Sequence, residues 1–227
     1  MGILIQEVSL RDKLYVFEDR NEAGRLLAEK LMNYKNSDAI IFGIPSGGVP
    51  IASELARSLK LTMDLIIVRK IKIPYNPEAG FGAIGPEGEI ILNERVLSQL
   101  RLTEKEMQEE ITKTKDVLKK RDRLFREERP LPIMKDKTII IVDDGLASGY
   151  TMISAIKFIK RKSPQKVIVG VPTGSGKTVD LVLSFVDELV CLNVRNRFPY
   201  AVAEAYRNWY DLTDEEVLRI IKSRSAG

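Results

Sequence analysis

Two adjacent aspartates, Asp143 and Asp144, occupy the position in this sequence where chemistry is most readily inferred. They follow an apolar run at residues 138–142 and precede a loop of small residues, 145–151, that leads into a segment of helical period. Backbone N–H groups at such a helix start, together with two hydroxyl side chains in the loop, suit a phosphate. Two carboxylates would repel that phosphate, so we expect them to face the other end of the ligand. There they would accept hydrogen bonds from vicinal sugar hydroxyls or hold the water ligands of Mg²⁺.

Three basic residues could supply positive charge to the same ligand. Arg69, Lys70 and Lys72 follow the apolar run at residues 64–68. A basic strand end in solvent is the alternative interpretation, and it would have similar weight without the neighbouring acids. A further loop follows the run at residues 39–43, and its glycines permit close approach of the backbone to a ligand. This loop comprises Ser46, Gly47 and Gly48.

The chain contains no histidine. This excludes Ser-His-Asp and Cys-His nucleophile systems, zinc sites built on imidazole, and a histidine general base. The one cysteine, Cys191, lies in an apolar run where buried free thiols are common, and it cannot form a disulfide within the chain. Any chemistry must therefore use carboxylates, lysine, arginine, backbone amides or a metal held by oxygen.

The 227 residues, 44% of them hydrophobic and 30% charged, suffice for one domain with a sizeable core. No apolar run approaches the ~20 residues that span a bilayer, and the first residues show no secretion signal. We therefore expect a cytoplasmic protein with no membrane partner. The net charge of +4 is mild, and the densest basic stretch, residues 119–129, is interleaved with acids as on a solvated helix face. This argues against a nucleic-acid partner, whose phosphates usually meet uncompensated basic residues.

Apolar runs of strand length alternate with segments of helical period. The runs are nearly continuous in Ile, Val and Leu, which is typical of parallel strands covered on both faces. They comprise residues 39–43, 64–68, 138–142, 166–170 and 189–192. The helical segments comprise residues 21–34, 49–59, 151–162 and 178–185. This order predicts an α/β fold with a doubly wound, mainly parallel sheet, whose ligands bind at the carboxyl ends of the strands.

Two segments interrupt the alternation. Residues 71–89 are rich in Gly, Pro and Glu, too long for a tight connection and too polar for a core, so we predict a flexible cover loop. Residues 103–129 predict a long charged helix with a capping box at Thr103 and Glu106. Its packing stripe comprises Met107, Ile111, Thr114, Leu118 and Phe125. A last helix begins with a second capping box at residues 213–216. We expect a single domain over residues 1–227, with the cover loop and helical insertion at 71–130.

The segment at residues 139–151 resembles the phosphoribosyl-pyrophosphate (PRPP) motif of type I phosphoribosyltransferases. That motif has four apolar residues, two acids, three variable residues, Thr or Ser, Gly, any residue, and Thr or Ser. Every constrained position matches. An ordinary strand-turn-helix is the alternative, but a turn alone would not require paired acids followed by Ser-Gly-x-Thr at fixed offsets.

Almost the whole chain is similar to a group of predicted bacterial and archaeal phosphoribosyltransferases whose substrate is not established. The similar segments comprise residues 19–28, 47–52, 68–70, 76–78, 82–85 and 213–217. Two positions depart from the wider pattern. Ser46 stands where that group typically has an arginine, which leaves the pyrophosphate loop without that cation. Ala147 stands where hypoxanthine-guanine enzymes carry an acid that helps to handle a proton of the base.

The resemblance implies that a ring nitrogen of a base attacks the anomeric carbon of PRPP while pyrophosphate leaves, with Mg²⁺ as the cofactor. It assigns Arg69, Lys70 and Lys72 to the pyrophosphate. It assigns Asp143 and Asp144 to the ribose hydroxyls and, directly or through water, to the metal. The remaining substrate-binding residues that it implies are Ser46, Gly47, Gly48, Gly145, Leu146, Ala147, Ser148, Gly149, Tyr150, Thr151, Phe198 and Tyr200. Residues 147–151 of this set would bind the 5-phosphate.

The acceptor in this interpretation is a small molecule, most simply a nucleobase. Phe198 and Tyr200 are the residues we predict to stack on it, because related enzymes place aromatic residues near the carboxyl end. Trp209 and Tyr210 are explained at least equally well as rings that pack against the last helix. The cover loop would close over the reaction centre and exclude water. A homodimer is compatible with the resemblance, but no residue pattern specifies it.

Two other classes of protein remain open. Residues 170–178 suggest a P-loop NTPase, but five residues separate Gly170 from Gly176 where the motif needs four. The stronger alternative is a non-catalytic sensor that binds PRPP or a nucleotide on the same fold. Ser46, Ala147 and the weakly defined acceptor site permit this alternative. Arg69, Lys70 and the long cover loop favour catalysis.

Overall fold

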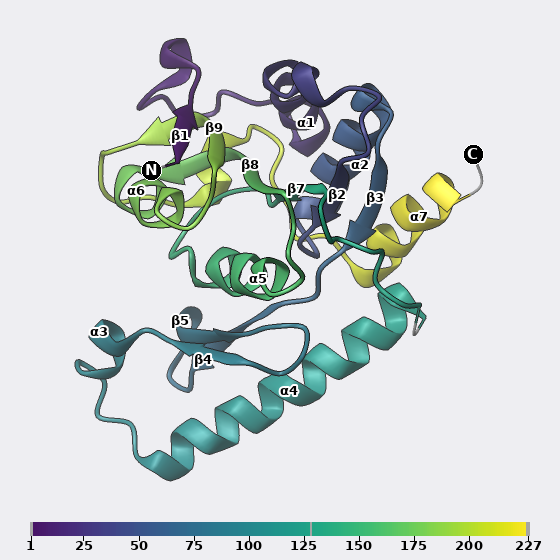
Figure 1. Ribbon diagram of the computed structural model, residues 1–227. Helices are drawn as coiled ribbons and strands as arrows, with labels where there is room; N and C mark the ends of the chain where they lie inside the picture. Colours follow the sequence, from purple (N-terminus) through teal and green to yellow (C-terminus); the bar gives the residue numbers. More distant parts are fainter. Residues whose placement is uncertain (1, 128, 226–227) are drawn as a thin grey trace.

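The computed structural model describes residues 2–127 and 129–225, without the side chains of residues 77, 78, 224 and 225. Its larger sheet has six parallel strands in the order β1-β9-β8-β7-β2-β3 (Figure 1). The strands are β1 (Ile3–Ile5), β2 (Ile40–Gly43), β3 (Thr62–Leu65), β7 (Thr138–Val142), β8 (Lys166–Ser175) and β9 (Glu188–Arg195). Every pairing among them is parallel, so the predicted parallel sheet is confirmed.

Helices cover both faces of this sheet. On one face lie α1 (Arg20–Lys30) and α2 (Gly48–Leu59), and on the other lie α5 (Tyr150–Lys160) and α6 (Gly176–Leu183), as Figure 1 shows. Side chains of β7 alternate between two core clusters, because successive residues of a strand point to opposite faces. Ile140 packs with α1 and α2, whereas Ile141 packs with α5 and α6. The doubly wound arrangement is therefore confirmed.

The segment predicted as a cover loop is instead a small antiparallel sheet. Its strands are β4 (Arg69–Ile73), β5 (Asn76–Ile84) and β6 (Ile90–Leu92), in the order β4-β5-β6. The expectation that residues 71–89 are too polar for a core is wrong, since Ile71, Phe81 and Ile84 are fully buried. These apolar residues are spaced by glycines and interrupted by bulges between β4 and β5, so no regular alternation marks the strands in the sequence.

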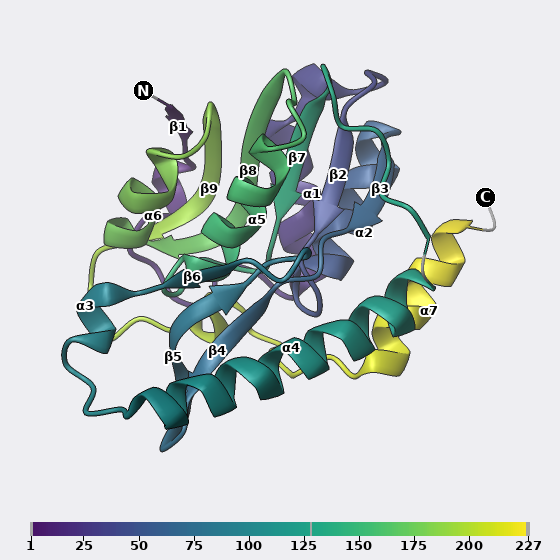
Figure 2. The ribbon, with the colours of Figure 1, turned by 60° about the horizontal axis from the view of Figure 1, so that its bottom comes forward.

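The small sheet lies between α5 on one side and α4 (Glu104–Arg126) on the other (Figure 2). The capping box of α4 is present, with the Glu106 carboxylate accepting from the Thr103 N–H at 2.8 Å. Ile111, Leu118 and Phe125 are buried, so α4 packs along the predicted stripe. The carboxyl half of α4 approaches α7 (Asp214–Ser225), and together they form a third core cluster with the small sheet.

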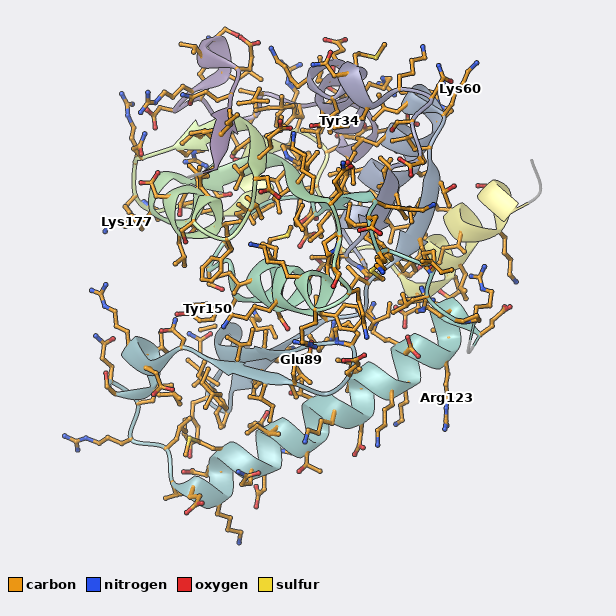
Figure 3. The ribbon with its side chains drawn as sticks, in the orientation of Figure 1. Tyr34, Lys60, Glu89, Arg123, Tyr150 and Lys177 are labelled. Atoms are coloured by element: carbon orange, nitrogen blue, oxygen red, sulfur yellow. The ribbon has the colours of Figure 1, made fainter. Side chains whose placement is uncertain are left out.

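Short helices complete the chain: η1 (Val8–Leu10), η2 (Met32–Tyr34), α3 (Glu94–Leu97) and η3 (Val202–Ala205). The glycine-rich stretch that suggested a P-loop is not a loop, because β8 continues through it to Ser175. Lys177 then lies exposed on the first turn of α6 (Figure 3). None of the helices in the described part of the chain has both the length and the apolarity that a bilayer crossing requires.

Candidate active site

A cleft of about 570 Å³ lies at the carboxyl ends of β2 and β7, where the large sheet faces the small one. It brings together thirteen of the residues predicted from the sequence, from three separate segments. They are Ser46, Gly47, Arg69, Lys70, Lys72, Asp143, Asp144, Gly145, Leu146, Ala147, Ser148, Gly149 and Thr151. Carboxylates, a small-residue loop and cations therefore share one space.

The two aspartates lie directly beyond the end of β7. The Asp144 carboxylate accepts from the Arg20 Nε at 2.9 Å, and the Asp143 carboxylate accepts from the backbone N–H of Asp144 at 2.8 Å. Burial raises the pKa of Asp143 well above its usual range, and the negative charge of Asp144 adds to the effect. Burial also raises the pKa of Asp144, although Arg20 opposes it. The positive charge of Arg20 therefore compensates ionisation of the pair only in part.

Arg20 is a partner that sequence reasoning did not identify. It is the first residue of α1, whose start is fixed by Asp19, since the Asp19 carboxylate accepts from the Glu22 N–H at 2.8 Å. Its guanidinium lies 3.9 Å from the centre of the Trp209 ring and donates to the Tyr210 carbonyl at 3.0 Å. An arginine immediately after an N-cap was the available signal, because its side chain starts near the carboxyl edge of the sheet.

The donor set is compatible with Mg²⁺. Within residues 2–127 and 129–225 no group of three His, Cys, Asp or Glu side chains gathers as a metal cage. Asp143 and Asp144 therefore offer a metal two carboxylate groups in the cleft. Mg²⁺ is commonly bound by one or two carboxylates while waters and substrate phosphates fill its other positions. The residues present fit that mode of binding.

The small-residue loop after the aspartates is held at both ends. The Leu146 N–H donates to the Thr173 carbonyl at 2.9 Å, and the Thr178 hydroxyl donates to the Ala147 carbonyl at 2.6 Å. Gly149, the N-cap residue of α5, has φ of +82°, a conformation that side-chain-bearing residues rarely adopt. The first N–H groups of a helix have no acceptor within the helix. The loop therefore offers amides around Ala147 and Ser148, which are both exposed.

Leu146 supports the loop from the core, whereas the resemblance implied that it binds substrate. Its side chain is buried in the core and its N–H is already bonded to β8, so it anchors the loop beneath the cleft. Tyr150 and Gly48 do not line the cleft at all. Gly48 opens α2 against the end of β7, where an added Cβ would lie 2.5 Å from the Val142 carbonyl oxygen. Its lack of a side chain serves packing.

Gly47, by contrast, lies against the aspartates. An added Cβ at this position would overlap the carboxylate of Asp144. We expect Gly47→Ala to keep a nearly unchanged melting temperature, because the carboxylate of Asp144 can move aside. The same variant should bind PRPP at least about tenfold more weakly, which corresponds to roughly 1.4 kcal/mol. We expect Gly48→Ala to lower the melting temperature by several degrees, because it meets backbone atoms that cannot move. Thermal melts and calorimetry with PRPP on both variants test these two expectations. Equal changes of melting temperature and PRPP affinity in the two variants would contradict them.

Positive charge lines the opposite wall. Arg69 and Lys70 lie on β4, and Lys72 follows them on the same strand, exposed. Burial lowers the pKa of Arg69, and the positive charge of Arg121 lowers it further. Arg121, on α4, was missed because residues 119–129 were interpreted as a solvated face. The available signal was its spacing, since it falls between Leu118 and Phe125 on the buried stripe of the helix.

The predicted acceptor residues lie elsewhere. Phe198 is 72% exposed with its ring facing Lys177, and Tyr200 is largely buried beside Arg195. Both follow β9, which β8 separates from β7 in the sheet, so neither reaches the cleft. The chain reaches the cleft only after Tyr200. The residues that line it there, which sequence reasoning did not select, are Val202, Trp209, Asp211 and Leu212.

Comparison with known proteins gives concordant results. A family model described as "Phosphoribosyl transferase domain" matches residues 18–205. A Mycobacterium tuberculosis protein, named in two strains as "Putative phosphoribosyl transferase" Rv0571c and MT0597, is 35% identical over 206 residues, or 91% of this chain. The chain spans about half, 46%, of the length of these curated relatives. The crystal structure of TT1426 from Thermus thermophilus is 35% identical with a TM-score of 0.73, covering 91% of this chain and 98% of that one.

Proposed function

Because this chain belongs to the phosphoribosyl transferase domain family, we propose that it transfers the 5-phosphoribosyl group of PRPP to a nitrogenous base and releases pyrophosphate. One observation carries the proposal: a single cleft presents an amide-rich loop, two carboxylates and a row of cations. PRPP has a phosphate, a diol and a pyrophosphate, and each of these groups meets a complementary one in the cleft.

The chain's own residues bind and orient the substrate. Amides and hydroxyls of residues 147–151 hold the 5-phosphate at the start of α5, where the helix dipole favours an anion. Asp143 and Asp144 accept hydrogen bonds from the ribose hydroxyls, which fixes the ring with its anomeric carbon facing the open cleft. Gly47 lets the backbone of its loop approach the same region closely. This orientation aligns the anomeric carbon between the leaving group and the acceptor.

Arg69, Lys70 and Lys72 act on the leaving group. As the bond from the anomeric carbon to the pyrophosphate oxygen breaks, positive charge develops on the sugar and negative charge on pyrophosphate. Fixed cations on β4 stabilise that negative charge, which is commonly the largest catalytic contribution. No protein nucleophile is required, in agreement with a chain that lacks histidine. Asp143 and Asp144 would hold Mg²⁺, which would supply further positive charge to stabilise the leaving pyrophosphate.

The acceptor binds beside Trp209. This ring lines the cleft, and Val202 and Leu212 supply apolar surface next to it. A planar base can pack against this apolar surface, and the carboxylate of Asp211 can accept a hydrogen bond from an N–H group of the base. These residues replace Phe198 and Tyr200 as the acceptor residues we propose. The small sheet, held to the end of α5 by Glu89 and Arg161 at 2.9 Å (Figure 3), covers the reaction centre.

Release of pyrophosphate from PRPP tests the function. With Mg²⁺ present, we expect one or a few members of a panel of purine, pyrimidine and pyridine bases to increase the rate strongly over the base-free control. The product should be the corresponding nucleoside 5′-monophosphate, identified by mass spectrometry. Tight PRPP binding without turnover on any base would instead establish the non-catalytic sensor. If PRPP neither binds nor reacts, the proposed function is wrong.

A further inference from the structure

Arg121 reaches the cleft from the helical insertion, far in the sequence from the other residues of the site. Its Nη2 donates to the Ser46 hydroxyl at 2.7 Å and to the Asp214 carboxylate at 2.6 Å. Its guanidinium lies 5.1 Å from the centre of the Phe125 ring, and only 13% of the side chain is exposed. The glycine loop, α4 and α7 thus hold this side chain in one place before any ligand arrives.

The charges around Arg121 are unbalanced. Its positive charge is close enough to Arg69 to lower the pKa of that residue, after the larger effect of burial. The carboxylate that it contacts, Asp214, is 46% exposed, so its negative charge is weakened by solvent. Two partly buried guanidinium groups on one wall repel each other, and Lys72 on the same wall adds to the positive charge. A polyanion bound in the cleft would offset this repulsion between the positive charges.

The geometry also leaves hydrogen-bond donors for such an anion. Both bonds made by Arg121 start from Nη2, and Nε and Nη1 donate to no other residue in the described part of the chain. A guanidinium presents five N–H donors in a planar fork that matches two oxygens of a phosphate. The small hydroxyl side chain of Ser46 leaves space for this fork, because a longer side chain there would occupy the same position.

We propose that Arg121 is a pyrophosphate-binding residue of the cleft. Ser46 and Arg121 then act as a complementary pair, in which the loop gives space and the insertion supplies the cation. Asp214 holds the guanidinium in place in the absence of the anion. When the anion binds, the Asp214 carboxylate competes only weakly with it for the guanidinium. This inference rests on the proposed function, since it assigns one more contact to the same substrate. It gives α4 a direct part in the site in addition to its structural contacts.

Calorimetry with magnesium pyrophosphate, PRPP and ribose 5-phosphate tests this assignment. We expect Arg121→Gln to weaken binding of pyrophosphate and PRPP by roughly 10- to 100-fold, the usual effect of losing a hydrogen bond to a charged group. Affinity for ribose 5-phosphate should stay the same, because that ligand lacks the pyrophosphate. The matched control is Arg123→Gln on the same helix, whose side chain points away from the cleft (Figure 3) and should leave all three affinities unchanged.

Two further variants separate a binding role from a structural one. The double variant Ser46→Arg, Arg121→Ser returns a guanidinium to the same wall from the loop, and we expect it to recover most of the pyrophosphate affinity. Asp214→Asn removes the competing charge and should strengthen pyrophosphate binding by about two- to fivefold, a few tenths to 1 kcal/mol. A purely structural Arg121 would predict weaker binding in both variants.

The outcomes distinguish this inference from the proposed function. If the unmodified protein binds PRPP and pyrophosphate but Arg121→Gln binds them equally well, the assignment of Arg121 is overturned and the function stands. If Arg121→Gln weakens ribose 5-phosphate as much as pyrophosphate and the double variant restores neither, the residue is structural. If the unmodified protein binds none of the three ligands, the function itself fails.

Discussion

Asp143→Asn should bind PRPP about 10- to 100-fold more weakly than the unmodified protein, because a hydrogen bond to a charged acceptor contributes roughly 1.5–3 kcal/mol. The substitution keeps the size of the side chain and the ion pair between Arg20 and Asp144. It removes the carboxylate that we propose receives the ribose hydroxyls and the metal. Calorimetry with PRPP and Mg²⁺ measures the change directly.

The same substitution should stabilise the ligand-free protein. Burial raises the pKa of Asp143 above its ordinary value of 3.8, so the folded state binds this proton more tightly than the unfolded state. Stability therefore falls as the pH rises from 3.8 through the raised pKa, and remains lower above it. Asparagine carries no such charge. At neutral pH we expect Asp143→Asn to melt on the order of 2–4 °C higher, the effect of about 1 kcal/mol in a protein of this size.

Opposite effects on affinity and stability are what identify Asp143 as a binding residue. At a pH below 3.8, the ordinary pKa of an aspartate, the two proteins should melt at the same temperature, since position 143 is then neutral in both the folded and the unfolded state of each protein. Asp38→Asn is the control: Asp38 is exposed before β2, at the amino edge of the sheet, and its replacement should change neither quantity. Unchanged PRPP affinity in Asp143→Asn would refute the assignment of the acids, and a lower melting temperature would make Asp143 a structural residue.

Arg69→Gln should reduce kcat by about 10²- to 10³-fold, the usual loss when one donor that stabilises developing charge is removed. Arg69 is a partly buried cation beside a second one, Arg121, so its removal relieves repulsion and should not unfold the protein. Turnover is measured with the base identified from the panel, or as hydrolysis of PRPP by water in its absence. Binding of ribose 5-phosphate should be unchanged.

Arg57→Gln provides the matched control for Arg69, because Arg57 is exposed on α2 and pairs only with Glu54 among the described residues. It should leave kcat and KM as they are. Arg69→Lys should recover part of the rate, since it retains the charge but not the fork of donors. A rise in KM with kcat unchanged would show that Arg69 binds substrate and transition state equally, which contradicts its proposed action on the leaving group.

The large sheet could be predicted from the sequence because its strands are buried on both faces. Continuous runs such as residues 138–142 have no other simple explanation in a chain of this composition. Strand ends were less accurate. β8 was predicted to stop at Gly170 but continues to Ser175, since residues 173–175 pair with β9 and Gly174 also pairs with Leu146. Local composition did not reveal that tertiary pairing.

The parts of the site within one strand-loop-helix unit were predictable, whereas those assembled from distant elements were not. Asp143, Asp144 and residues 145–151 belong to one continuous segment whose spacing carries the information. Arg121 and Trp209 reach the cleft only through the packing of α4 and of the segment after η3. Their positions depend on contacts between elements that are far apart in the sequence. No fixed spacing of residues in the sequence indicates such contacts.

A crystal structure of the protein with PRPP and Mg²⁺ bound tests the central claim most directly. We predict electron density for the 5-phosphate against the amides of residues 147–151 and for the ribose hydroxyls within hydrogen-bond distance of Asp143 and Asp144. The pyrophosphate should lie toward Arg69 on β4. Density for the ligand outside this cleft, or with its 5-phosphate and pyrophosphate in exchanged positions, would contradict the account.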